Sequence, residues 1–236
     1  MTVIMVCSDR SRVGRSLLTS ILAEALPLAQ VVAVAGSDAL TRYANGNSDK
    51  SRNGNSDLSR NSRMHSIPAS DGVDHLQSEM LTAISDLPSD LILIDFPFAI
   101  DRTDDLFVDA LREIGHEVRM AYIVSPDGRS RQNLLNSAFG KQADRLLAVI
   151  NAYMPNAVRS WSRSVEAQRW PGLTEIWSSP PARVLPVINE SNMSFSELWS
   201  ASGGQPIVNR QAIKWWYERT TNNVCKSLLS NNRIDY

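Results

Sequence analysis

Short apolar runs alternate with segments of helical periodicity along most of the chain. Residues 1–7 are apolar apart from Thr2, which predicts a buried strand, and the polar stretch after them leads into apolar positions at helical spacing from Leu17 to Leu26. Residues 31–35 are a second short run, rich in β-branched side chains, which predicts a strand buried on both faces, as in a parallel sheet. The chain therefore opens with a strand, a helix and a second strand.

The same alternation continues through the middle of the chain. Apolar runs predict strands at 91–97, 119–124 and 146–151, and apolar spacing predicts helices at 73–87, 104–113 and 210–229. Strands that alternate with helices are typical of a doubly wound, mostly parallel α/β sheet. No apolar run approaches the roughly 18 residues that a membrane span requires.

A polar repeat interrupts this pattern. Residues 45–52 and 53–60 are two copies of one eight-residue sequence that differ at a single position. Their Asn, Gly, Ser and Asp residues favour turns and solvated backbone. We therefore expect a flexible surface insertion at about 44–72 within a single domain that spans residues 1–236. The alternative function for the insertion is contact with DNA phosphates through three arginines: Arg52, Arg60 and Arg63.

Composition narrows the functional classes. The 236 residues are 43% hydrophobic and 21% charged, as in an ordinary globular domain, and the formal net charge of -1 provides no global polycation for nucleic-acid binding. The two cysteines, Cys7 and Cys225, have no metal-ligand spacing, and we expect a cytoplasmic protein. All six tryptophans follow residue 160, where they fill a core or an interface or, as the alternative, stack on nucleic-acid bases.

Polar residues follow the predicted strands. They are the segment 8–16, Asp38, Asp95, Asp127 and Asn151. Ligands of open α/β sheets bind at the carboxyl ends of the strands, so we expect these residues to share one edge of the sheet.

The segment 8–16 has the form of an anion site. Gly14, Arg15 and Ser16 stand where a polar turn enters a helix, so backbone N–H groups and the helix dipole would face an anion. Against the phosphate loop GxxxxGK[ST], the chain keeps Gly14 and Ser16, and Arg15 replaces the lysine. The pattern also fits a solvated basic turn, or a site for DNA or another anion.

Here the chain resembles the ParA/MinD family of P-loop ATPases, whose loop reads KGGxGK[ST]. In register, residues 10–16 read RSRVGRS, with both lysines replaced by arginine and the two leading glycines by Ser11 and Arg12. The resemblance extends, in order, to the end of a hydrophobic strand at 93–97. Further segments that resemble the family lie at 124–127, 150–151, 185–188 and 202–207.

The resemblance implies a fold of P-loop NTPase type and a set of site residues. Nucleotide would contact Arg10, Ser11, Arg12, Val13, Gly14, Arg15, Ser16, Asn151 and Pro186. Arg10 would reach the nucleotide of a second subunit, Ser16 and Asp95 would hold Mg²⁺, and Arg15 with Asp38 would be catalytic, Asp38 by orienting water. Asp38 and Asp95 also fit simpler roles, as a helix N-cap and a turn cap.

The function that the resemblance implies is an ATP- and Mg²⁺-dependent switch in the segregation or mobilisation of plasmids or DNA. We expect a homodimer, a DNA-binding partner protein, DNA itself as a further partner, and slow hydrolysis. The alternative is a pseudo-ATPase adaptor that keeps the fold without productive nucleotide binding. The missing loop glycines and lysine favour this alternative.

Overall fold

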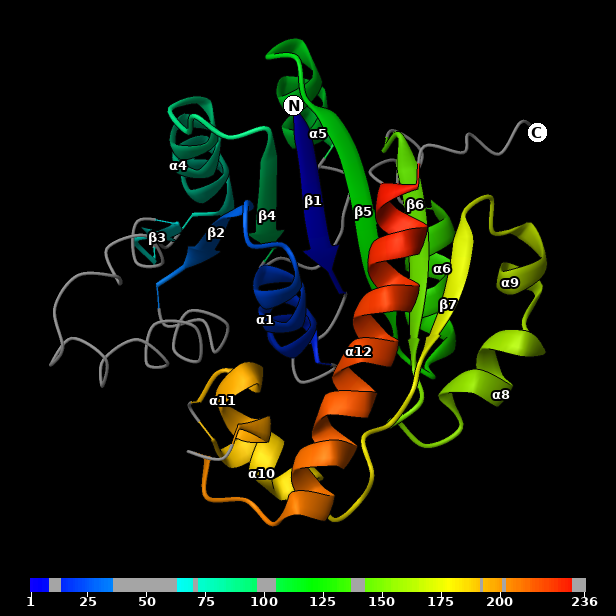
Figure 1. The fold of residues 1–236 in the computed structure, drawn as a ribbon. Helices are drawn as coiled ribbons and strands as arrows, with labels where there is room; N and C mark the ends of the chain where they lie inside the picture. Colours follow the sequence, from blue (N-terminus) through cyan, green and yellow to red (C-terminus); the bar gives the residue numbers. More distant parts are fainter. Residues whose placement is uncertain are drawn as a thin grey trace, which may run out of the picture.

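The chain builds one parallel sheet. The structure is a computed structural model that describes residues 1–8, 14–35, 63–69, 72–96, 105–136, 143–191, 193–200 and 203–230. Within them, the strands are ordered β3-β2-β4-β1-β5-β6-β7, and all the pairings are parallel (Figure 1). The strands are β1 (Thr2–Cys7), β2 (Gln30–Val34), β3 (Met64–Ile67), β4 (Leu91–Asp95), β5 (Glu117–Val124), β6 (Arg145–Asn151) and β7 (Leu173–Trp177).

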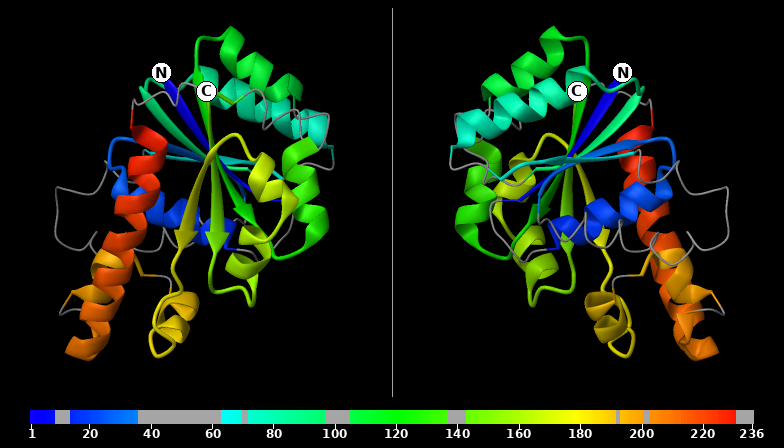
Figure 2. Two further views of the ribbon diagram at one scale, coloured as in Figure 1. Left: turned by 90° about the vertical axis from the view of Figure 1, so that its right-hand side faces the viewer. Right: turned by 90° about the vertical axis from the view of Figure 1, so that its left-hand side faces the viewer.

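Helices cover both faces of the sheet (Figure 2). One face carries α1 (Arg15–Ala25), α10 (Leu185–Glu190), α11 (Phe195–Trp199) and α12 (Ile207–Leu229). The other carries α4 (Val73–Ser85), α5 (Asp105–Glu113), α6 (Gly128–Asn136), α8 (Ala157–Ser162) and α9 (Val165–Arg169). The predicted doubly wound α/β architecture is confirmed.

The sheet is buried on both faces because successive strand residues point to opposite sides. In β1, Val3 and Met5 join the core under α4 and α5, whereas Ile4 and Val6 join the core under α1 and α12, and all four are fully buried. This two-sided burial explains the apolar runs by which the central strands were predicted.

Both outermost strands differ from the sequence-based expectations. β3 lies inside the range 44–72 that we expected to be an insertion, and there the expectation is wrong: residues 64–67 pair with β2. β7 falls in a tryptophan-containing segment for which no strand was predicted. The repeat at 45–60 lies outside the described residues.

The aromatic side chains confirm core filling for several of the tryptophans. Trp216 stacks on Trp177 with ring centroids 6.4 Å apart, and both are buried. Phe195 of α11 packs against the same Trp216 at 6.0 Å, which fixes α11 on α12. Trp215 is the exception, since 56% of its surface is exposed.

The carboxyl ends of the parallel strands lie at one edge of the sheet. In Figure 1 the arrows of the central strands point toward the region of α10, α11 and the first turns of α12. The first turn of α1 also lies at this edge, because α1 follows β1 after a short connection. None of the described helices is both long and apolar enough to cross a membrane.

Candidate anion site at the start of helix α1

Gly14 forms the entrance to α1. Its φ of 96° is left-handed, a conformation that strains residues with a side chain. A Cβ at this position would lie 2.9 Å from Cζ3 of Trp177 and 3.2 Å from Nδ2 of Asn151. Position 14 therefore requires glycine for two reasons, backbone conformation and close packing.

Asp95 accepts hydrogen bonds from polar side chains at the start of α1. Its Oδ1 accepts a hydrogen bond from Nε of Arg15 at 2.7 Å, and its Oδ2 accepts one from the hydroxyl of Ser16 at 3.0 Å. A longer contact of 3.4 Å joins the Thr19 hydroxyl to Oδ1. The arrangement is a charge-assisted cluster around one carboxylate.

Strand order brings these residues together. β4 lies beside β1, and Asp95 is in register with Val6, one residue before β1 ends. α1 begins eight residues after the end of β1 and packs against β4. On the other side of β1, Asn151 and Trp177 end the adjacent strands β6 and β7 in register with each other. A Cβ at Gly14 would contact both of these residues, so the start of α1 lies over the sheet edge.

Burial determines what the cluster can do chemically. Asp95 is 1% exposed, whereas the Arg15 side chain is 20% exposed. Only Nε of Arg15 has a hydrogen-bond partner among the described residues, so the two Nη groups are available to an external ligand. The first turn of α1 carries no acidic residue that would repel an anion. The site therefore combines a helix N-terminus with a cation that a buried carboxylate holds in place.

The same geometry tests whether the described residues fit a magnesium ion. Mg²⁺ at phosphate sites is held by one or two carboxylates together with phosphate and water. Both oxygens of Asp95 accept hydrogen bonds, and the guanidinium of Arg15 forms an ion pair with Oδ1. The described residues contain no group of three His, Cys, Asp or Glu side chains that could hold a metal. In this arrangement a Mg²⁺ ion at Asp95 would have to displace the Arg15 guanidinium or the Ser16 hydroxyl.

The other predicted site residues fall into two groups. Asn151 lies beside Gly14 and accepts a hydrogen bond from the Tyr153 N–H at 3.0 Å. Pro186 is exposed in the first turn of α10. The rest lie outside the described residues: Arg10, Ser11, Arg12, Val13 and Asp38.

Sequence reasoning missed two residues of the site. Thr19 follows Ser16 by three positions, a spacing that puts both side chains on one face of a helix, and this signal was available. Trp177 ends a strand that the sequence did not predict. Its proximity to Gly14 depends on the order of strands in the sheet, which no local sequence pattern predicts.

Comparison with known proteins shows the fold. The MinD cell division protein of Aquifex aeolicus superposes with a TM-score of 0.51 and 15% sequence identity, over 94% of this chain and 98% of that one. A plasmid partition protein from Borrelia burgdorferi has a TM-score of 0.43 and 13% identity, over 92% and 98%. No family model and no curated protein matches the sequence. The chain thus has the α/β fold of the MinD cell division protein.

Proposed function

We propose that this chain is a nucleotide-dependent switch of the ParA/MinD type that acts in the segregation or mobilisation of DNA. The observation that carries the proposal is Arg15, whose Nε is held by Asp95 while its Nη groups have no partner among the described residues. Arginine can bind a phosphate through two parallel hydrogen bonds. The fold shared with a MinD cell division protein supports the same assignment.

The phosphates of a nucleotide would be bound by positioning and charge. The N–H groups at the start of α1 supply hydrogen bonds and a positive dipole end, and Arg15 supplies a full charge. Asp95 acts as a positioning residue, since it fixes the orientation of the guanidinium. If hydrolysis occurs, we expect slow turnover that rests on electrostatic stabilisation of the phosphoryl group. ATP, Mg²⁺, dimerisation, a DNA-binding partner and a cytoplasmic location are parts of this proposal.

A second candidate function is an adaptor that has kept the fold without productive nucleotide binding. The specific observation in its favour is the occupied Asp95, because the guanidinium and the Ser16 hydroxyl take both of its oxygens. A metal ion could reach the carboxylate only after displacing Arg15 or Ser16. Such a protein would act through its surfaces rather than through a nucleotide cycle.

Titration with a fluorescent ATP analogue separates the two candidates. The switch predicts saturable binding that Arg15→Ala weakens at least tenfold, about 1.4 kcal/mol. Arg15→Lys should also weaken binding, because a single ammonium cannot hold Asp95 and fork onto phosphate at once. Titrations with and without Mg²⁺ test the metal, and light scattering in each state tests dimerisation.

The matched control is Arg112→Ala. Arg112 pairs with Asp144 at the same N–O distance of 2.7 Å, but this pair lies at the opposite strand ends, beside the N–H of Val118. Its loss should leave nucleotide affinity unchanged. Absence of binding at millimolar ATP or ADP would select the adaptor. Unchanged affinity in a folded Arg15→Ala variant would remove Arg15 from the site.

A further inference from the structure

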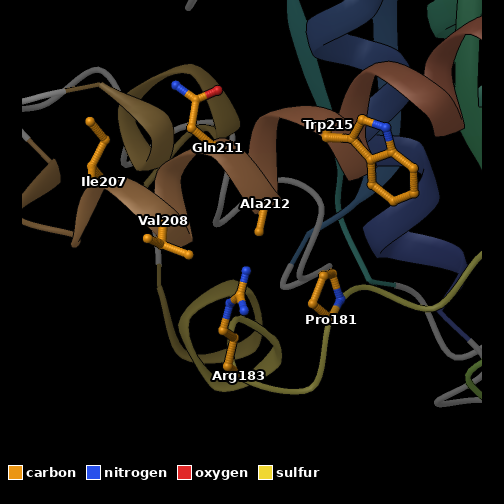
Figure 3. A pocket seen from close by; sticks show the side chains of 7 residues that line it. All are labelled: Pro181, Arg183, Ile207, Val208, Gln211, Ala212 and Trp215. Carbon is orange, nitrogen blue, oxygen red and sulfur yellow. The ribbon is translucent and has the colours of Figure 1, made fainter.

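A groove of about 480 Å³ lies along the first turns of α12 (Figure 3). Its residues are Pro181, Arg183, Ile207, Val208, Gln211, Ala212 and Trp215. Ile207, Val208 and Trp215 are each more than half exposed. Large apolar side chains that gather on an exposed surface mark an interaction site more often than single ones do.

α12 carries two apolar faces. The face toward the sheet and α11 is buried and includes Ile213, Trp216 and Tyr217. The groove face contains Val208, Ala212 and Trp215, at the spacing i, i+4, i+7 that aligns side chains on one side of a helix. The second stripe contributes little to the described core, yet it has the spacing with which a helix receives a partner helix.

Arg183 gives the groove its charge. Figure 3 shows its guanidinium pointing toward the space between Pro181 and α12. No carboxylate of the described residues forms an ion pair with it. A second guanidinium, that of Arg219, lies 5.4 Å from the ring centroid of Trp215. The carboxylate of Glu218, the neighbour of Arg219 in the sequence, already pairs with Lys214 at 3.8 Å.

We propose that this groove docks an acidic amphipathic segment, such as a helix, of another protein. Apolar anchors of the segment would cover Val208 and Trp215, and a carboxylate would meet Arg183. The carboxylate is required because a cation that is buried without a partner costs more than apolar contact returns. The site is separate from the Asp95 cluster, so the proposal does not rest on nucleotide binding.

The charges and shape of the groove disfavour two other occupants. In a symmetric dimer through this groove, a second copy of this chain would bring its own Arg183 and Arg219 to the interface. Its Glu218 carboxylate already pairs with Lys214 of the same copy. A lipid surface requires apolar groups that protrude, whereas these residues line a hollow between α12 and the segment at 181–183. An acidic protein segment satisfies both the shape and the charge.

Selection from a random 16-residue peptide library on the whole 236-residue chain tests the proposal. We expect enriched peptides to combine apolar residues at i, i+4 and i+7 with Asp or Glu. Their affinity should fall at least tenfold with Trp215→Ala and with Arg183→Glu. Leu106→Ala is the matched control, because Leu106 is 75% exposed on α5, across the sheet, and its loss should change nothing. Trp215 is itself exposed, so its substitution should not unfold the chain.

A charge reversal makes the test specific. Replacing the acidic residues of an enriched peptide with lysine should abolish binding to the wild type and restore it to Arg183→Glu. The proposal is overturned if no peptide is enriched relative to Trp215→Ala, or if enriched peptides are basic. It is also overturned if Trp215→Ala abolishes self-association measured by light scattering, or flotation with anionic phosphatidylserine vesicles, since the occupant would then be a second copy or a membrane.

Discussion

The ion pair between Arg15 and Asp95 can be measured by a double-mutant cycle. The substitutions are Asp95→Asn, which keeps the shape and the acceptor oxygen for Ser16, and Arg15→Met, which keeps the apolar stem. Asp95 is 1% exposed and the Arg15 side chain 20% exposed, so loss of the carboxylate charge leaves a half-buried guanidinium without its partner. Breaking such a pair from one side costs about 3 kcal/mol.

For a chain of this size, that cost should lower the Tm by about 6–12 °C. The double variant should lose less than the sum of the single variants, with a coupling of about 2 kcal/mol, because the Nε–Oδ1 bond is short and charge-assisted. The assay is urea unfolding followed by tryptophan fluorescence, with circular dichroism to confirm that each variant is folded.

An exposed pair provides the reference value. Lys214 and Glu218 are one helical turn apart on α12, with an N–O distance of 3.8 Å and about half of each side chain exposed. Their coupling in the same assay should be about 0.3–0.5 kcal/mol. If the coupling of Arg15 with Asp95 does not exceed that of this pair, Asp95 does not hold the guanidinium in solution. The positioning role assigned to Asp95 would then be wrong.

Two further predictions concern stability. Gly14→Ala should lose about 1–3 kcal/mol more stability than Gly204→Ala in thermal unfolding. Both glycines have a positive φ, but only a Cβ at position 14 would meet Trp177. Equal losses would show that backbone strain alone matters. Burial lowers the pKa of both His116 and His65 below 6.5, so their protonation favours the unfolded chain. The free energy of unfolding should therefore fall as the pH drops below about 6.5, and His116→Gln should flatten that dependence; an unchanged pH profile would argue against it.

The sequence predicted the central strands and missed the outer ones for a physical reason. Strands such as β1 and β4 are covered on both faces, so they read as continuous apolar runs. The two strands at the edges of the sheet, β3 and β7, are short and half covered, and their sequences MHSI and LTEIW mix polar with apolar residues. Edge strands carry the weaker pattern because, within the described part of the chain, each has a neighbouring strand on one side alone.

The candidate site shows the same division. Gly14, Arg15, Ser16 and Asp95 could be selected from strand ends and loop spacing, because these features are local. Their pairing could not be derived from spacing, since it depends on β4 lying next to β1. Arginine rather than lysine at position 15 determines the geometry of the cluster. A guanidinium can donate to Asp95 through Nε and still present two Nη groups to a ligand.

Helix α12 connects the two surfaces that we assign to ligands. Trp216 packs on Trp177, which closes against Gly14 at the entrance of α1, whereas its neighbour Trp215 turns into the groove. Adjacent residues of a helix differ by about 100° in direction, so one element serves the core and the surface at once. Of the second stripe, Ala212 also packs against the described core, whereas Val208 and Trp215 are more than half exposed. Because an exposed second stripe lends little to the described core, a partner gives the better physical account of it.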